Sequence, residues 1–366
     1  MKLRICHFVP IFQVASGVST FAGEIANVQC SIGHDVTIAT LPRFLIAHYP
    51  VSDSVCVVDM VQGIDWSSSP PNIVHIHGLW TLGLHRVVSK AVTAGVPIVW
   101  SPHGMLAPWA MAHKRWKKWP VWHLWQKRDL LHAKVFHATS ELEVEWIRRL
   151  GFSQDVVTVP LGTHLPPIKA REALSPGDSH VLLFVGRIYP IKGLVNLLQA
   201  WGMLKSSGNS QVHKWMIRLV GPDQAGHVEE LKKLAERLGI SDSVIFTGPL
   251  FGEELAKEYR QADCFVLPSF TENFGGVVVD ALSYGVPVIA STATPWSILQ
   301  QEPQSGWWVS NEPRKLADCL ARIMEMTREQ RRQLGMNGRE RVEERYTWTT
   351  VAQKMSEVYE EVVTRR

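Results

Sequence analysis

The clearest arrangement of residues for chemistry is a pair of cations at a turn between an expected strand and an expected helix. The segment Val185-Gly-Arg-Ile-Tyr-Pro-Ile-Lys-Gly193 follows a short apolar run and contains Arg187 and Lys192. The first backbone N–H groups of a helix have no partner within the helix and therefore favour anions. Two cations beside such a terminus indicate a diphosphate site, and a solvated loop with two surface cations is the alternative.

A second segment combines two acids with two glycines after another apolar run. Its members are Glu272, Asn273, Phe274, Gly275, Gly276 and, eight residues after Glu272, Asp280. Glycines at a helix start expose backbone amides to an anion. A carboxylate at either acidic position can accept hydrogen bonds from sugar or ribose hydroxyls. The alternatives are favourable charge at a helix N-terminus for Glu272 and a solvated Asp280.

Together these motifs resemble the family 4 retaining glycosyltransferases of GT-B fold, to which sucrose synthase and phosphatidylinositol mannosyltransferase belong. The resemblance rests on the order Arg187, Lys192 and then Glu272-x-Phe-Gly-x₄-Asp280, closed by Gly-Val-Pro-Val, and it runs along nearly the whole chain. It implies two doubly wound α/β domains that face each other across a cleft, with a nucleotide sugar as the donor.

The resemblance also implies roles for the residues of the second half. Arg187 and Lys192 would neutralise the donor diphosphate, while Glu272 and the backbone amides that follow it would hold the donor sugar. Asp280 stands where the family has the acid that grips the ribose hydroxyls. That acid is normally Glu, so Asp280 must lie closer to the ribose or reach it through water.

In the first half, the resemblance places Gly17 where a glycine of the first loop approaches the donor phosphate. The family usually has two glycines there, whereas Ser16 precedes Gly17 in this chain. His103, in Ser-Pro-His-Gly, would lie beside the reacting centre. His75 and His77 alternate along an expected strand, so one face of that strand could instead hold a structural histidine.

Residues 109–134 interleave tryptophans with cations. The tryptophans are Trp109, Trp116, Trp119, Trp122 and Trp125, and the seven Lys and Arg residues oppose the single Asp129 for a formal charge of +6. Basic helices with a tryptophan face lie in anionic membrane interfaces, which is the favoured interpretation. Packing of the tryptophans on the domain is the main alternative. Nucleic-acid binding is the least favoured, and we expect no nucleic-acid partner.

The elements that position these residues are short apolar strands alternating with helices, which is typical of parallel sheets covered on both faces. In the first half the expected strands are Leu3–Val9, Val36–Ala39, Val55–Val58, Ile73–Ile76, Ile98–Ser101, Val135–Ala138 and Val156–Val159. In the second half they are Val181–Val185, Met216–Val220, Val244–Phe246, Cys264–Leu267 and Val286–Ala290. Ligands bind such sheets at the carboxyl ends of the strands, where the strand order reverses.

A proline-rich stretch divides the two series. We expect an N-terminal acceptor-side domain over residues 1–165, a linker over 166–178 and a donor domain over 179–345. A last helix, about 346–366, is expected to pack back on the first domain. The whole formal charge of +4 lies in residues 1–165, which suggests an anionic partner for that half.

The five cysteines have no C-x-x-C spacing, which argues against a disulfide framework or zinc site and fits the cytoplasm. No window of the chain approaches the ~20 apolar residues of a membrane span. We therefore expect a cytoplasmic protein that docks peripherally at the inner face of the plasma membrane.

The expected function is retaining transfer of a hexose from a nucleotide diphosphate sugar to a glycan or lipid-linked acceptor in cell-surface polysaccharide biosynthesis. No Asp-x-Asp occurs, and neither a metal nor a cofactor is expected. A nucleotide-sugar epimerase of GT-B architecture and an inactive nucleotide-sugar binding module remain as alternatives.

Overall fold

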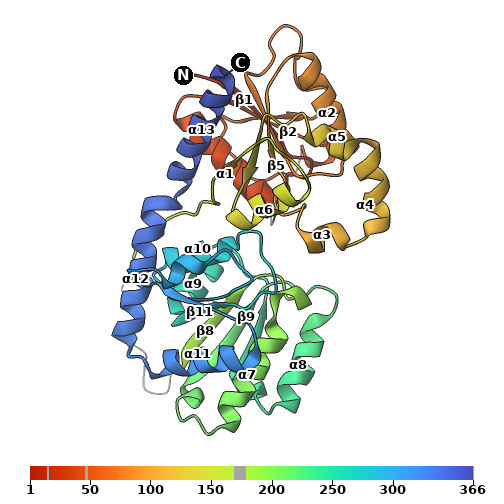
Figure 1. Ribbon diagram of the computed structural model, residues 1–366. Coiled ribbons are helices and arrows are strands. Elements are labelled where there is room, and N and C mark those ends of the chain that lie inside the picture. Colours follow the sequence, from red (N-terminus) through yellow and green to blue (C-terminus); the bar gives the residue numbers. More distant parts are fainter. Residues whose placement is uncertain (15, 46–47, 169–178, 366) are drawn as a thin grey trace. The chain divides into compact units, whose positions relative to one another are not determined.

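The computed structural model describes residues 1–14, 16–45, 48–168 and 179–365. The chain forms two compact units (Figure 1). Unit 1 comprises residues 1–162 together with 348–366, and unit 2 comprises residues 163–347. Residues 169–178, most of the expected linker, lie outside the described residues.

Unit 1 is built on a seven-stranded, fully parallel sheet with the order β3-β2-β1-β4-β5-β6-β7. The strands are β1 (Arg4–Phe8), β2 (Asp35–Thr40), β3 (Cys56–Asp59), β4 (Ile73–His77), β5 (Ile98–Ser101), β6 (Val135–Ala138) and β7 (Asp155–Thr158). All seven expected strands of this half are confirmed within one residue at each end. The strand order reverses between β1 and β4, so a ligand site is expected at their carboxyl ends.

Two separate hydrophobic clusters cover the two faces of this sheet. On one face, α1 (Gly17–Ser31) and the last helix, α13 (Trp348–Thr364), pack against the strands and each other. On the other face lie α2 (Leu82–Thr93) and residues such as Ile147 of α6 (Glu141–Arg149). Burial on both faces explains why the strands are apolar at almost every position.

Unit 2 contains a six-stranded parallel sheet with the order β10-β9-β8-β11-β12-β13. Its strands are β8 (His180–Val185), β9 (Trp215–Val220), β10 (Val244–Gly248), β11 (Cys264–Leu267), β12 (Val288–Ser291) and β13 (Gly306–Val309). Its longer helices are α7 (Leu194–Ser206), α8 (His227–Arg237), α9 (Gly252–Gln261), α10 (Gly276–Ser283), α11 (Pro313–Glu325) and α12 (Arg328–Arg345). The order reverses between β8 and β11, and the two cation- and acid-bearing segments follow these two strands.

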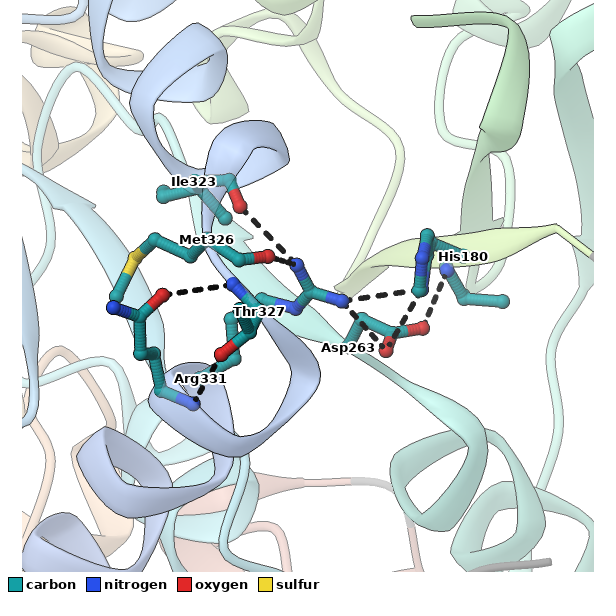
Figure 2. A network of polar contacts seen from close by, with 8 residues as sticks. His180, Asp263, Ile323, Met326, Thr327 and Arg331 are labelled. Atoms are coloured by element: carbon teal, nitrogen blue, oxygen red, sulfur yellow. Dashed lines mark hydrogen bonds and ion pairs between the residues drawn. The ribbon is translucent and has the colours of Figure 1, made fainter. Parts of the chain in front are cut away.

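A buried arginine ties α12 to this sheet (Figure 2). The Arg331 guanidinium donates to the carbonyl oxygens of Ile323 and Met326, at 3.3 and 2.5 Å, and lies 3.6 Å from the Asp263 carboxylate. Asp263 in turn accepts a hydrogen bond from the Val181 amide at the start of β8. Because Arg331 is only 3% exposed, these contacts are what allow its charge to be buried.

Candidate functional site

In unit 2, the loops that follow β8 and β11 are held together by their backbones. The Phe270 N–H donates to the Ile191 oxygen at 2.9 Å. Gly193 has φ of +69°, and a Cβ at this position would lie 2.0 Å from the Pro268 oxygen. Glycine is therefore required both by the left-handed conformation and by the approach of the second loop.

This contact brings Lys192 and Glu272 together, although 80 residues separate them in sequence. Lys192 Nζ lies 2.5 Å from Glu272 Oε1, and their side chains are 15% and 13% exposed. The Ser269 hydroxyl donates to the same carboxylate oxygen at 2.8 Å. The predicted diphosphate cation and the predicted sugar-binding acid therefore form one partly buried ion pair in the free protein.

The first turn of α10 faces the same loops. Gly275 precedes the helix with φ of +80° and Gly276 begins it, as the sequence indicates, so Glu272 and Asn273 lie in the loop before the helix. Phe274 is buried against Trp296, whose indole N–H donates to the Phe274 oxygen at 2.6 Å. The helix start is thus anchored by packing, and its free backbone amides can bind an anion.

Arg187 lies in the loop between β8 and α7. A short 3₁₀ turn, Pro190–Lys192, comes first, and α7 begins only at Leu194. Arg187 is exposed and donates to Gln224 Oε1 at 3.1 Å. Unlike Lys192, it has no acidic partner in the described part of the chain.

Asp280 lies in the second turn of α10 and accepts a hydrogen bond from the Thr163 hydroxyl at 2.6 Å. Burial raises the pKa of Asp280 from 3.8 to about 6, against the opposing effects of Thr163 and His164. Asp280 is only partly exposed and hydrogen-bonded, so the alternative of a fully solvated carboxylate is wrong.

In unit 1, Gly17 begins the helix that also carries a contact of His103. Gly17 is the first residue of α1, and a Cβ there would meet nothing within 4 Å, so no contact within the described protein requires glycine. Phe21, one turn later on α1, packs edge-on against the His103 ring at 5.4 Å. His103 itself has φ of +52°, a strained conformation for a residue with a side chain and one that is common at functional sites.

His103 belongs to a group of five histidines, the others being His7, His75, His77 and His137. Burial lowers the pKa of His7 and His137 to about 4 and that of His103 to about 3, and it lowers those of His75 and His77 well below the usual value. All five are therefore neutral at physiological pH.

Three of these histidines, His7, His75 and His77, bring ring nitrogens within 4.8 Å of one another, a spacing that could hold a metal ion. However, all six of their ring nitrogens are already hydrogen-bonded to side chains. A metal would have to break these bonds, so the cluster is better described as a buried hydrogen-bond network.

The predicted site residues thus fall into two groups, one in each unit. In unit 2 the structure joins Lys192 to Glu272, and it places Asp280 against Thr163 instead of against another predicted residue. The sequence did not single out Ser269 or Thr163. Their only signal in the sequence is a hydroxyl side chain close to the end of a strand, and such residues are too common to indicate a site.

The segment 109–134 consists of α3 (Pro108–Ala112), α4 (Arg115–Val121), a π-helical turn (Trp122–Gln126) and α5 (Lys127–Leu130). Its tryptophans divide into two sets. Trp116 and Trp119 are 74% and 57% exposed, whereas Trp122 packs against Phe152 in the core of unit 1. The core interpretation therefore holds for Trp122, whereas the membrane interpretation stays a prediction for the exposed tryptophans. Within the described residues, no helix is both long and apolar enough to cross a membrane.

Comparison with known protein families gives matches in both units. Residues 57–162 match the glycosyl transferase 4-like domain, and residues 167–341 match the glycosyl transferases group 1 family. A D-inositol 3-phosphate glycosyltransferase 2 of Catenulispora acidiphila is 35% identical over 197 residues, 52% of this chain and 45% of that protein. A D-inositol 3-phosphate glycosyltransferase of Streptomyces bingchenggensis is 35% identical over 238 residues, 62% of this chain and 52% of that protein. The chain spans about half the length of these relatives.

Solved structures with the same fold cover nearly the whole chain. Sucrose-phosphate synthase from Thermosynechococcus elongatus has a TM-score of 0.77 at 20% identity, with 99% of both chains covered. HepE from Anabaena, in complex with UDP and glucose, has a TM-score of 0.72 at 18% identity, with 97% of this chain and 99% of that chain covered. WaaG, a glycosyltransferase involved in lipopolysaccharide biosynthesis, has a TM-score of 0.69 at 14% identity over 97% and 99% of the two chains.

Proposed function

We propose that this chain, which belongs to the group 1, family 4 glycosyltransferases of GT-B fold, transfers a hexose from a nucleotide diphosphate sugar to a hydroxyl group with retention of configuration. The acceptor is a glycan or a lipid-linked sugar of cell-surface polysaccharide biosynthesis. The observation that carries the proposal is the contact between Lys192 and Glu272 at the carboxyl ends of β8 and β11. A cation, an acid and an anchored helix start there suit a diphosphate bonded to a sugar.

In the proposed reaction, the acceptor hydroxyl attacks the anomeric carbon from the face that the nucleotide leaves. Lys192, Arg187 and the amides of Gly275 and Gly276 stabilise the charge that grows on the departing diphosphate. That diphosphate takes the acceptor proton, so neither a metal nor a protein base is needed. Glu272 holds the donor sugar, and Asp280 accepts hydrogen bonds from the ribose. Gly17 lets the phosphate approach α1, and His103 lies beside the reacting sugar.

A thermal-shift screen against UDP, ADP, GDP and their glucose derivatives tests donor binding, because a ligand that binds only the folded state raises the melting temperature. HepE, which shares the fold, is described in complex with UDP, so UDP is the first ligand to test. Lack of stabilisation by every nucleotide would refute the proposal. Product formed without an acceptor would favour the epimerase, and tight binding without turnover would favour the binding module.

A second proposal concerns the exposed part of the segment 109–134, which we infer to dock on an anionic membrane surface. Trp109, Trp116 and Trp119 are exposed at 46%, 74% and 57%, and Leu124 and Leu131 at 63% and 57%. Large apolar side chains interleaved with cations suit the headgroup boundary of a membrane. Co-sedimentation with vesicles containing phosphatidylserine tests this, with neutral vesicles as the control.

A further inference from the structure

Four of the five neutral histidines of unit 1, His7, His75, His77 and His137, lie on one face of its sheet because of strand register, and His103 follows in the turn after β5. His7 of β1 pairs with His75 of β4, and His77 of β4 pairs with Ser101 of β5. Paired residues of adjacent parallel strands point to the same face, and so do residues two apart on one strand. This is the face that α1 and α13 cover, and these helices contribute Gln29 and Tyr359 to the network.

The network has a fixed starting point at a backbone carbonyl. His137 Nε2 lies 2.7 Å from the Val159 oxygen, which can only accept, so His137 carries its proton on Nε2. Neutral His137 then has a lone pair on Nδ1, which accepts from the Ser101 hydroxyl at 2.6 Å. The Ser101 oxygen accepts in turn from His75 Nε2–H, also at 2.6 Å. Nδ1 of His75 is left to accept from the Tyr359 hydroxyl, at 2.5 Å.

A second series of hydrogen bonds begins at Gln29. Its side chain is fully buried, and Oε1 lies 2.9 Å from His7 Nε2. Nε2 of Gln29 has no hydrogen bond of standard geometry within the described residues. The atom of the amide that faces His7 is therefore the oxygen, which can only accept a hydrogen bond.

The second series carries this direction to His103. With the Gln29 oxygen facing His7, the proton of His7 is on Nε2 and its Nδ1 accepts from His77 Nε2–H at 3.0 Å. Nδ1 of His77 then accepts from His103 Nε2–H at 2.9 Å. Among the described residues, every ring nitrogen of the five histidines has a partner except Nδ1 of His103.

We propose that this buried series of hydrogen bonds holds His103 as its Nε2–H tautomer, so that Nδ1 meets a bound substrate only as an acceptor for a hydroxyl group. Gln29 is the positioning residue that sets the direction of these hydrogen bonds. If its amide were flipped, the protons of His7, His77 and His103 would each move to the other ring nitrogen, and Nδ1 of His103 would become a donor. The choice of a sugar hydroxyl as the ligand rests on the proposed function, whereas the tautomer does not.

The tautomer is measured on the ligand-free protein by long-range ¹H–¹⁵N NMR of histidine-labelled samples, which distinguishes a protonated from an unprotonated ring nitrogen. The chain has 15 histidines, so the His103 signals are assigned as those lost in His103→Gln. We expect Nε2 protonated and Nδ1 unprotonated. A proton on Nδ1, or an even mixture of tautomers, would overturn the proposal.

Gln29→Met tests the positioning role, because methionine fills similar space without a polar amide. We expect a mixed His103 tautomer and roughly tenfold weaker binding of a nucleotide sugar, with unchanged binding of the matching free diphosphate. The probe pair is UDP-glucose with UDP, or the ADP or GDP pair if the screen selects it. Gln154→Met is the matched control: it loses two hydrogen bonds to backbone oxygens in the same unit but should leave the tautomer and both affinities unchanged.

Gln29→Glu keeps an acceptor for His7 Nε2–H and should retain the wild-type tautomer, which provides a second variant should Gln29→Met fail to fold. An unchanged His103 tautomer in a folded Gln29→Met, or a changed one in Gln29→Glu, would refute the role of Gln29. Failure of every nucleotide to bind would refute the proposed donor instead, and the NMR result would stand by itself.

Discussion

Lys192→Ala and Glu272→Gln should change the affinity for a free nucleoside diphosphate in opposite directions. In the ligand-free protein the two side chains form an ion pair at 2.5 Å, with exposures of 15% and 13%. An ammonium group has three donors, so Lys192 can bind a phosphate without leaving Glu272. Glu272, in contrast, is a negative charge close to the place where we expect the diphosphate.

The magnitudes follow from these two contacts. Loss of the charge-assisted hydrogen bonds of Lys192 should cost about 1.5–3 kcal/mol, or roughly 10–150-fold in affinity. Glu272→Gln removes a like charge near the proposed phosphate position, and two like unit charges about 4 Å apart repel by about 1 kcal/mol in bulk water and about 4 kcal/mol at an effective dielectric constant of about 20. The free diphosphate should therefore bind Glu272→Gln roughly tenfold more tightly, while turnover of the nucleotide sugar falls.

Isothermal titration with UDP, or with the diphosphate that the screen selects, measures both effects. The control is Lys205→Ala, which breaks another lysine–carboxylate pair of unit 2, Lys205 with Asp242 at 2.8 Å, at the far end of α7. That variant should bind like the wild type. Equal weakening in Lys192→Ala and Glu272→Gln would mean that the pair only supports the loops, and unchanged binding in both would place the diphosphate elsewhere.

Three further predictions concern other parts of the chain. Because burial raises the pKa of Asp280 to about 6, the native state holds this proton more tightly than the unfolded chain does. The stability that this proton contributes should be lost as the pH rises from about 4 to 7, which lowers the free energy of unfolding by about 3 kcal/mol. Urea unfolding at several pH values should show this decrease in the wild type and a smaller decrease in Asp280→Asn. Trp119→Ala should abolish vesicle binding without changing the melting temperature, whereas Trp122→Ala should lower stability by about 3 kcal/mol or more and spare vesicle binding. Activity should survive a chelator, and NMR of the product should show the anomeric configuration of the donor; an inverted product would refute the proposed reaction.

The strands were predictable because parallel strands buried on both faces must be apolar at nearly every position. β13 (Gly306–Val309) was missed, since Gly-Trp-Trp-Val has one β-branched residue and stands beside polar turns. The loops after β8 and β11 could also be located, because cations, acids and glycines directly follow apolar runs. Sequence could not show that the two loops touch, as this depends on β8 and β11 being neighbours in the sheet.

The histidine network left a weaker signal in the sequence. His75 and His77 alternate on one strand, which indicates a polar face, and His7 and His137 each stand in another apolar run. Their common face follows only from the register of β1 with β4, and from the order of β5 and β6 beside them. The partners Gln29 and Tyr359 come from helices that are far apart in the chain, so no local pattern could connect them.

The side chains that we propose for the reaction are neutral in unit 1 and include two cations in unit 2. In unit 1 burial lowers the pKa of the histidines, and in the proposed tautomer His103 Nε2–H donates to His77, so His103 would orient a hydroxyl but would have no proton to give a leaving group. In unit 2, Arg187 and Lys192 supply fixed positive charge. In the proposed reaction the cationic side chains that stabilise the departing diphosphate therefore belong to unit 2, and the proton of the acceptor is expected to end on the diphosphate itself. A histidine base would instead require His103 to become an imidazolium, which its surroundings oppose by lowering its pKa to about 3.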